Sequence, residues 1–317
     1  MRFTRIDYCE VQRALKTPDQ TDFNTSFHSA EEAPDLIRPS ESPISFKRWL
    51  PVILSLRNTP SSAPLVQIVT LSKSQARLLL RTAEGSLQTG SLNRMYAEDI
   101  ADEINPVLES QLVFPPEGLF LRLAACSPKD GAQLIRGKIA MTTVEEVILR
   151  LVTSVRARNA LFNSLEAGDE TFDLFFLPFD DRMGSDQEYR VFCPPGGRKI
   201  TAISQYEWHK EWRYSLQEDD VRKHTVHTMM SGITAVHQRI LGDLDEENKL
   251  DNLFLQQGFS FDIFFDETTE ICELVELNGF GARSSCGSCL FQWVKDREQL
   301  YGGTEDMEFR VAISSLS

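Results

Sequence analysis

Carboxylate and amide side chains lie inside two of the most apolar segments of this chain, and this feature limits how the chain can fold. The stretch SFDIFFDETTEICELVELNGFG, Ser260 to Gly281, holds Asp262, Glu276 and Asn278 among aliphatic and aromatic residues. Keeping a carboxylate charged in apolar surroundings is costly, so such a group needs a partner. These three side chains are therefore candidates for a binding site.

Alternation along the two segments predicts that these side chains share one face of a sheet. Successive residues of a strand point to opposite faces, so Glu276 and Asn278 lie on one face of the second segment, together with Leu274. The intervening DETTE suits a hairpin turn. If the two strands pair as neighbours, Asp262 converges with Glu276 and Asn278.

Two interpretations of this trio remain open. Two carboxylates and an amide on a rigid sheet form a seat for magnesium, which takes a few protein oxygens and completes its shell with water and phosphate. Such a site implies a nucleotide. Alternatively, Asp262 and Glu276 are partly exposed acids on an edge strand, and Asn278 begins a turn with Gly279. Spacing alone favours neither interpretation.

Phosphate binding also needs cations, and four basic residues lie in or beside predicted strands. In GLFLRLAAC the leucines share one face and Arg122 lies on the other, where it must find an anion or reach solvent. Each of the four, taken singly, is better explained as a solvated or ion-paired side chain. Together they are candidates for one cleft: Arg122, Lys129 in SPKDG, Lys138 in IRGKIAM and Arg190 in EYRVF.

Charge and composition exclude several classes of protein. The 33 basic and 47 acidic residues give a net charge of -14 over 317 residues. This argues against broad binding of nucleic acid or anionic membranes, which relies on Lys and Arg. With no apolar run of about 20 residues and no signal peptide at the start, we expect a cytoplasmic protein. The Cys286-x-x-Cys289 pair lacks the second pair of a structural zinc site.

The order of predicted elements indicates an α+β fold. Residues 1–43 are polar and read as an extended or partly ordered lead-in. Apolar spacing predicts one helix from Thr142 to Leu161 and a long helix from Glu218 to Leu241. The last third runs hairpin, helix, strand, turn, strand, an order that predicts a largely antiparallel sheet backed by helices.

Four blocks of the sequence resemble, in order and spacing, those of the cell division cycle 123 family. The blocks are LFLRLAACSPKDGA, EYRVF followed by KITAISQYEW, FSFDIFFDE, and ELVELNGFG with SCLFQW, within Trp49 to Trp293. The resemblance implies an ATP-grasp-type fold with two subdomains and an ATP cleft between them. We place the subdomains at residues 44–179 and 180–317. It further implies ATP and magnesium as ligands, and an assembly chaperone that holds the gamma subunit of translation initiation factor 2.

The resemblance also implies roles for individual residues. Lys129 and Lys138 would approach the phosphates, with Arg122 as a further phosphate ligand. The segment FFLPF, Phe175 to Phe179, would form the linker against which adenine packs, and its candidate contacts are Phe176, Leu177 and Phe179. Arg190 would face the terminal phosphate and is the candidate catalytic residue. Magnesium would be held by Asp262, Glu276 and Asn278.

Departures from the family pattern keep other functions open. Arg122 stands where the family usually has lysine, and Glu276 where it usually has aspartate, which is shorter by one methylene. These changes suggest a divergent paralogue. One alternative is an ATP-dependent ligase that joins a small carboxylate to an amine through an acyl phosphate, with Arg190 stabilising the transferred phosphoryl group. Another is a pseudo-enzyme scaffold that no longer binds nucleotide.

Overall fold

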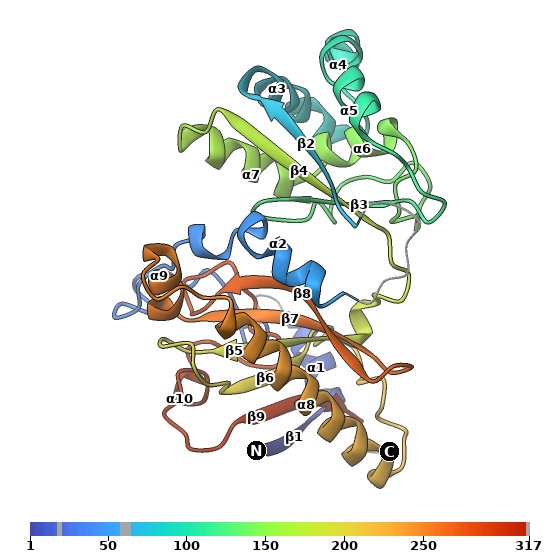
Figure 1. The fold of residues 1–317 in the computed structure, drawn as a ribbon. Coiled ribbons are helices and arrows are strands. Elements are labelled where there is room, and N and C mark those ends of the chain that lie inside the picture. The colour runs from blue at the N-terminus through green and yellow to red at the C-terminus, as the bar shows by residue number, and fades with distance from the viewer. Residues whose placement is uncertain (18–20, 58–64, 315–317) are drawn as a thin grey trace. The chain divides into compact units, whose positions relative to one another are not determined.

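The computed structural model describes residues 1–17, 21–57 and 65–314, which form two compact units. Unit 1 comprises Met1–Asn58 and Arg182–Ser317, and unit 2 comprises Thr59–Asp181. The chain thus leaves unit 1, forms unit 2, and returns (Figure 1). In the part of the chain so described, no helix is long and apolar enough to cross a membrane.

Unit 1 is built on a mixed six-stranded sheet in the order β1-β9-β6-β5-β7-β8. The pairs of β9 with β1 and β6 are parallel, and the others are antiparallel. The strands are β1 (Arg2–Asp7), β5 (Glu188–Cys193), β6 (Ala202–Gln205), β7 (Phe259–Asp266), β8 (Ile271–Gly279) and β9 (Glu308–Ile313). The helices are α1 (Tyr8–Leu15), α2 (Phe46–Ser55), α8 (Asp219–Gly242), α9 (Lys249–Gln257) and α10 (Arg297–Leu300), with short 3-10 turns η1 (Ser42–Ile44) and η3 (Ser185–Gln187).

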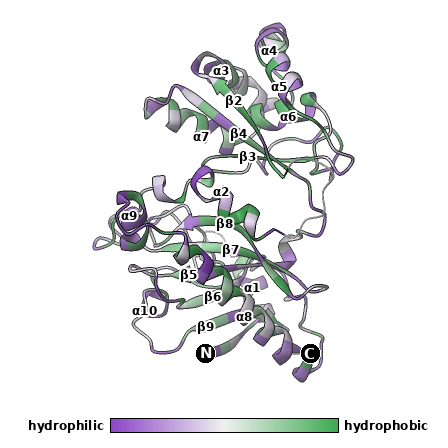
Figure 2. Ribbon diagram, in the orientation of Figure 1, coloured by the Kyte–Doolittle hydropathy of each residue, from purple (hydrophilic) through white to green (hydrophobic). Residues whose placement is uncertain are grey.

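Unit 1 includes the beginning of the chain. Strand β1 pairs along its length with β9, so residues predicted as a polar lead-in complete the sheet edge. Helix α2 packs on β8, which places its residues in unit 1 rather than with residues 59–181. Hydrophobic residues run along β7 and β8 (Figure 2), consistent with the burial of every residue of β7.

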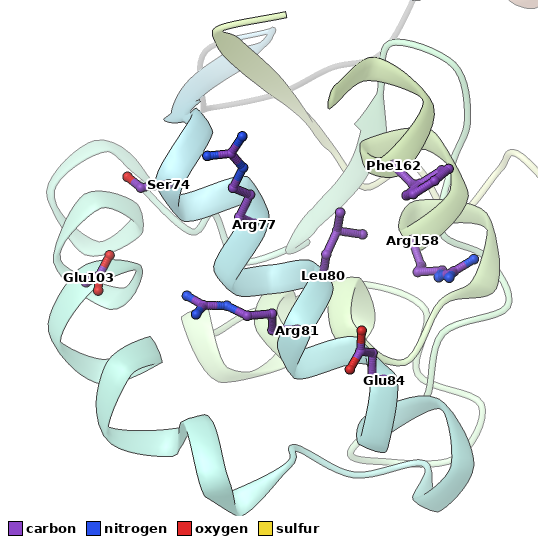
Figure 3. A pocket seen from close by; sticks show the side chains of 8 residues that line it. All are labelled: Ser74, Arg77, Leu80, Arg81, Glu84, Glu103, Arg158 and Phe162. Carbon is purple, nitrogen blue, oxygen red and sulfur yellow. The ribbon is translucent and has the colours of Figure 1, made fainter. Parts of the chain in front are cut away.

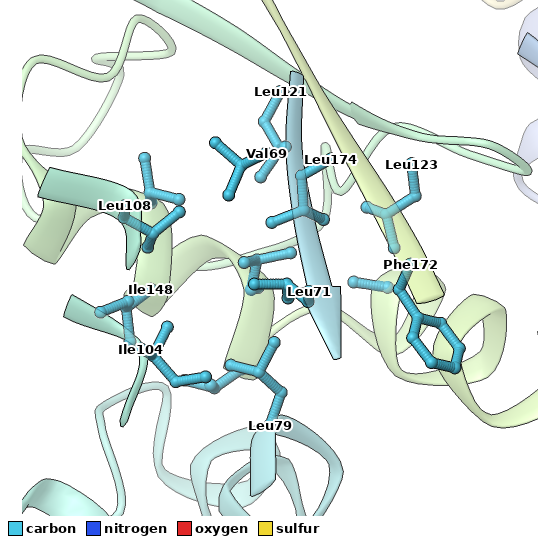
Figure 4. Close-up of a cluster of buried hydrophobic side chains, with 14 of the residues drawn as sticks. Val69, Leu71, Leu79, Ile104, Leu108, Leu121, Leu123, Ile148, Phe172 and Leu174 are labelled. Atoms are coloured by element: carbon cyan, nitrogen blue, oxygen red, sulfur yellow. The ribbon is translucent and has the colours of Figure 1, made fainter. Parts of the chain in front are cut away.

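Unit 2 is a three-stranded antiparallel sheet in the order β2-β4-β3 with helices on one face. Its core joins alternate residues of the strands, such as Val69, Leu121 and Leu174, to helix residues such as Leu79 and Ile148 (Figure 4). The elements are β2 (Gln67–Ser72), β3 (Leu119–Leu123), β4 (Thr171–Pro178), α3 (Lys73–Thr89), η2 (Arg94–Tyr96), α4 (Ala97–Glu103), α5 (Asn105–Gln111), α6 (Val144–Val152) and α7 (Val155–Glu166). The predicted α+β class is confirmed.

The single helix predicted from Thr142 to Leu161 is wrong, because α6 and α7 are separate helices. The break lies at Thr153 and Ser154, and Ser154 caps α7 by accepting a hydrogen bond from the backbone N of Ala157. Thr153 Oγ1 accepts one from the backbone N of Ala132 at 2.8 Å. Polar side chains that bond to the backbone in this way favour helix ends over helix interiors.

Candidate functional site

The hairpin of β7 and β8 brings the three predicted oxygen donors together in unit 1. The strands pair antiparallel, with Asp262 opposite Glu276 and Ser260 opposite Asn278. Residues that face each other across a strand pair point to the same side of the sheet. Asp262, Glu276 and Asn278 therefore lie on one face, and the predicted pairing of the two strands is confirmed.

A β-bulge in β8 changes one detail of the predicted face. The register shifts between Asp262 and Ile263, so that Ile263 pairs with Leu274 and Val275 is the extra residue. An extra residue reverses the alternation beyond it. Leu274 thus lies on the face opposite Glu276, and the expectation that the two share a face is wrong.

Arg190 reaches this trio from the neighbouring strand β5, where it lies directly opposite Asp262. Its Nε and NH2 atoms donate to the two carboxylate oxygens of Asp262 at 2.8 and 2.7 Å. Its NH1 donates to the backbone O of Gly287 at 2.8 Å, and its guanidinium lies 5.0 Å from the ring centroid of Tyr206. Two parallel hydrogen bonds of this kind form a strong, orientation-specific ion pair. Both partners are buried.

The electrostatics of the site are those of one cation facing two carboxyl groups. Burial raises the pKa of Asp262, Arg190 opposes this, and the hydrogen-bonded neighbour Glu276 raises it further. Burial alone would lower the pKa of Arg190. The negative charge of Asp262 outweighs this effect and raises the pKa well above its ordinary value. Asn278 Nδ2 donates to Asp262 Oδ2 at 3.2 Å and completes the cluster.

Two buried thiols lie close to the same cluster. Cys286 Sγ is 3.0 Å from Ser260 Oγ. Burial, opposed by Arg190, raises the pKa of Cys286 to about 11 and that of Cys289 to about 12. The thiolate is the form that binds metals and attacks disulfides. Both cysteines are therefore neutral thiols at physiological pH, and the sequence feature Cys-x-x-Cys is part of the packing around Arg190.

The donor set fits magnesium in chemical type, since the ion prefers carboxylate and amide oxygens. Both oxygens of Asp262 accept a hydrogen bond from Arg190, which reduces the number of lone pairs that Asp262 can offer to an ion. Glu276 and Asn278 are only partly buried. Within residues 1–17, 21–57 and 65–314, no group of three or more His, Cys, Asp or Glu side chains is placed to hold a metal.

Arg122 and the predicted adenine linker lie on the sheet of unit 2. Arg122 is opposite Phe175, on the sheet face that the helices do not cover, and it is buried. Leu177 points to the same face as Phe175. Phe176 points the other way and packs in the core of unit 2, while Phe179 is partly exposed and its N donates to Gly118 O at 2.9 Å.

The two candidate lysines lie in the loop between β3 and α6. Lys129 is exposed. Lys138 Nζ donates to Glu146 Oε1 at 2.8 Å and to Thr142 Oγ1 at 2.7 Å. These contacts lower the pKa of Glu146 against the effect of its burial. Lys138 is therefore ion-paired within unit 2.

Sequence reasoning missed Arg150, which holds this loop in place. Arg150 lies in α6, is buried, and donates from NH1 to Gly131 O at 3.3 Å and from NH2 to Lys138 O at 3.4 Å. These hydrogen bonds hold the loop backbone at Gly131, shortly after Lys129, and at Lys138. The available signal was an arginine between Leu149 and Leu151, within the otherwise apolar stretch 147–152.

The close approach of this loop to α6 predicts that Gly131→Ala destabilises unit 2. A Cβ at Gly131 would lie 2.3 Å from the backbone O of Arg150, a position that only a backbone shift relieves. Overpacking of this kind costs about 1–3 kcal/mol. Thermal unfolding measures it. Gly242→Ala is the control, since nothing lies within 4 Å of that Cβ, and an unchanged melting temperature for Gly131→Ala would contradict the prediction.

The α+β architecture of this chain is found among solved structures. The chain has the fold of Cdc123. It is similar to Cdc123 from Schizosaccharomyces pombe with a TM-score of 0.59 and 18% identity, over 87% of this chain and 99% of that chain. It is also similar to C-terminally truncated Cdc123 from Schizosaccharomyces pombe, with a TM-score of 0.56, 17% identity and coverage of 87% and 99%. The sequence matches no protein-family profile and no curated protein. The predicted resemblance is confirmed at the level of the fold.

Proposed function

We propose that this chain binds ATP with magnesium and acts as an assembly chaperone for the gamma subunit of translation initiation factor 2. The fold of Cdc123 supports this proposal, because the chain shares it over 87% of its length. The observation that carries nucleotide binding is the buried Arg190–Asp262 pair with Glu276 and Asn278 beside it. Such a cluster combines a cation for phosphate with oxygen donors for a divalent ion.

In this proposal Arg190 changes its anion when nucleotide binds. The guanidinium releases Asp262 and takes the terminal phosphate, whose oxygens match its planar fork. Asp262, Glu276 and Asn278 would hold magnesium, which would neutralise charge on the phosphates. The glutamate at position 276 reaches further than an aspartate by about 1.5 Å. The β-bulge beside Asp262 adjusts the strand at the position where this longer side chain must fit.

The sequence resemblance assigns further nucleotide contacts to residues of unit 2. Lys129 and Arg122 contact phosphates, and Leu177 and Phe179 pack against adenine, with Phe176 supporting them from the core. Lys138 is ion-paired with Glu146 and would bind phosphate after leaving that carboxylate. The same kind of exchange is proposed for Arg190. Nucleotide binding stabilises the folded chain by mass action and so orders the surface offered to the partner.

Calorimetric titration with ATP tests the site. We expect magnesium to strengthen binding to the unaltered chain, and Asn278→Ala to remove most of that gain. Lys129→Ala should weaken binding at least about tenfold with or without magnesium, which corresponds to about 1.4 kcal/mol. Arg136→Ala is the matched control, because Arg136 is an exposed cation of the same loop. The site assignment is wrong if neither Asn278→Ala nor Lys129→Ala weakens binding.

A second measurement separates the chaperone from the ligase. The purified carboxy-terminal domain of the gamma subunit is titrated against the chain with and without ATP and magnesium. Tighter binding in the presence of nucleotide, without release of ADP, supports the chaperone. Release of ADP that requires a small carboxylic acid and an amine, with no binding of the gamma subunit, supports the ligase and contradicts the chaperone.

A further inference from the structure

A pocket of about 580 Å³ lies on the helical side of unit 2, between α3, α4 and α7 (Figure 3). Its lining joins three arginines to two apolar side chains. We call it the arginine groove, defined by Arg77, Leu80, Arg81, Arg158 and Phe162. Glu84 and Glu103 also line it.

The arginines of α3 form a stripe on the outer side of the helix. Arg77 and Arg81 are four residues apart, a spacing that puts two side chains on the same helix face. Figure 3 shows both projecting from α3 into the groove. The opposite side of α3 carries Ala76, Leu79 and Ala83, of which Ala76 and Leu79 belong to the core cluster of unit 2.

Both arginines of this stripe are exposed. Among the described residues, Arg77 and Arg81 form no ion pair, and the recorded contact of Arg81 is with the Tyr96 ring, 5.9 Å from its centroid. Like charges at this spacing repel one another and destabilise a helix. Two exposed arginines on one helix face are therefore a place where an anionic group can bind, beside the carboxylates of Glu84 and Glu103 that line the same pocket.

The floor of the groove is apolar. Phe162 on α7 is 45% exposed, and Arg158 lies over its ring at 5.7 Å from the centroid. Leu80 is partly buried and packs against the core cluster, and Figure 3 shows it between α3 and Phe162. An exposed aromatic ring beside arginines is typical of surfaces that bind other proteins.

The groove is separate from the proposed nucleotide contacts of unit 2. Arg122 and Leu177 lie on the sheet face that the helices do not cover, whereas the groove lies on the helices that cover the other face. The sheet and its core stand between them. Occupancy of the groove and of the nucleotide contacts can therefore be measured independently.

We propose that the arginine groove binds an acidic peptide segment of a partner protein. Two carboxylates of the segment pair with Arg77 and Arg81, and a bulky apolar side chain between them packs on Leu80 and Phe162. Charge complementarity supports this occupant, because the three arginines and two glutamates of the lining leave a net positive charge on a chain whose net charge is -14. That net charge disfavours nucleic acid, whose phosphates extend past the groove, while a short peptide presents its carboxylates only to the arginines.

Selection from a random 12-residue peptide library tests this proposal. The library is panned on the full chain, and peptides that also bind the Arg77→Glu/Arg81→Glu variant are removed. We expect the remaining peptides to carry two acidic residues about four positions apart with a bulky apolar residue between them. By fluorescence anisotropy, their glutamine counterparts should bind about tenfold more weakly, and the double variant should bind them about 30-fold more weakly.

The controls make each outcome decisive. Arg94→Glu/Arg136→Glu reverses two exposed charges of unit 2 outside the groove and should leave peptide binding within about twofold. Circular dichroism confirms that both double variants are folded. The proposal is overturned if no peptide distinguishes the unaltered chain from Arg77→Glu/Arg81→Glu, or if the distinguishing peptides are not acidic. It is equally overturned if a single-stranded DNA oligonucleotide binds with the same arginine dependence and displaces the peptides.

Discussion

Arg190→Gln lowers the free energy of unfolding by about 3–5 kcal/mol, because it leaves Asp262 as a buried carboxylate without its cation. Asp262 has no exposed surface, and Arg190 supplies hydrogen bonds to both of its oxygens. Glutamine retains donors for one bond but brings no charge. Urea unfolding followed by circular dichroism measures the loss, which exceeds that expected for any exposed ion pair of the chain.

The loss of stability in Arg190→Gln should increase as pH rises. Arg190 opposes the rise in the pKa of Asp262, so its removal raises that pKa further. A carboxyl group with a raised pKa in the folded state binds more protons there than in the unfolded state, so stability falls as pH rises. Below the ordinary aspartate pKa of about 3.9 the group is protonated in both states and no charge is buried. The difference between Arg190→Gln and the unaltered chain should therefore grow as pH increases from about 4 toward 8.

Two further variants separate this explanation from a simple loss of contacts. Arg190→Met/Asp262→Leu removes both charges and should recover much of the stability, because well-packed apolar residues can replace a buried ion pair. Arg198→Gln breaks an ion pair whose partners are 66% and 81% exposed, and should cost less than about 1 kcal/mol. The explanation is contradicted if the double replacement is less stable than Arg190→Gln alone.

Local patterns were sufficient to predict the hairpin but not its partner strand. Alternation and the DETTE turn gave the pairing of β7 with β8, because a hairpin is set by neighbouring sequence. The Arg190–Asp262 pair depends on β5 lying beside β7, across 72 residues of chain. Each residue was a candidate for ligand binding by itself. Strand order decides whether they first satisfy each other, and strand order is a tertiary property.

Other features escaped prediction for identifiable physical reasons. The bulge at Val275 arises within a strand whose composition is regular, so no local signal marks the reversal at Leu274. The break between α6 and α7 depends on Thr153, whose side chain bonds the distant Ala132. Strand β1 looked like part of a polar lead-in because it lies at the sheet edge and pairs with the last strand of the chain.

The direction of each side chain within β4 decides which residues of the segment Phe175 to Phe179 pack in the core of unit 2. The resemblance named Phe176, Leu177 and Phe179 together as adenine contacts, but adjacent strand residues cannot all point to one face. Phe176 has no exposed surface and belongs to the core of unit 2, whereas Leu177 points to the other face. The linker is thus shared between the core and the proposed nucleotide contacts.

Phe176→Ala should therefore lower the free energy of unfolding of unit 2 by about 3–5 kcal/mol, the range for removal of a buried aromatic ring. The ring packs among strand and helix residues of the core, and its loss leaves a cavity that the sheet cannot close. Phe179→Ala is the matched control on the same linker. Because Phe179 is partly exposed, its truncation should cost less stability than that of Phe176.

The effects of the two substitutions on ATP affinity should be the reverse of their effects on stability, with the larger loss for Phe179→Ala. At a temperature at which Phe176→Ala is folded, its affinity for ATP should stay within about threefold of the unaltered chain, a difference below 1 kcal/mol. Phe179→Ala should lose affinity, since it removes apolar surface from a proposed adenine contact. A Phe176→Ala chain that is stable but does not bind ATP would contradict the packing role, because a core residue affects ligand binding mainly through the stability of the fold that presents it.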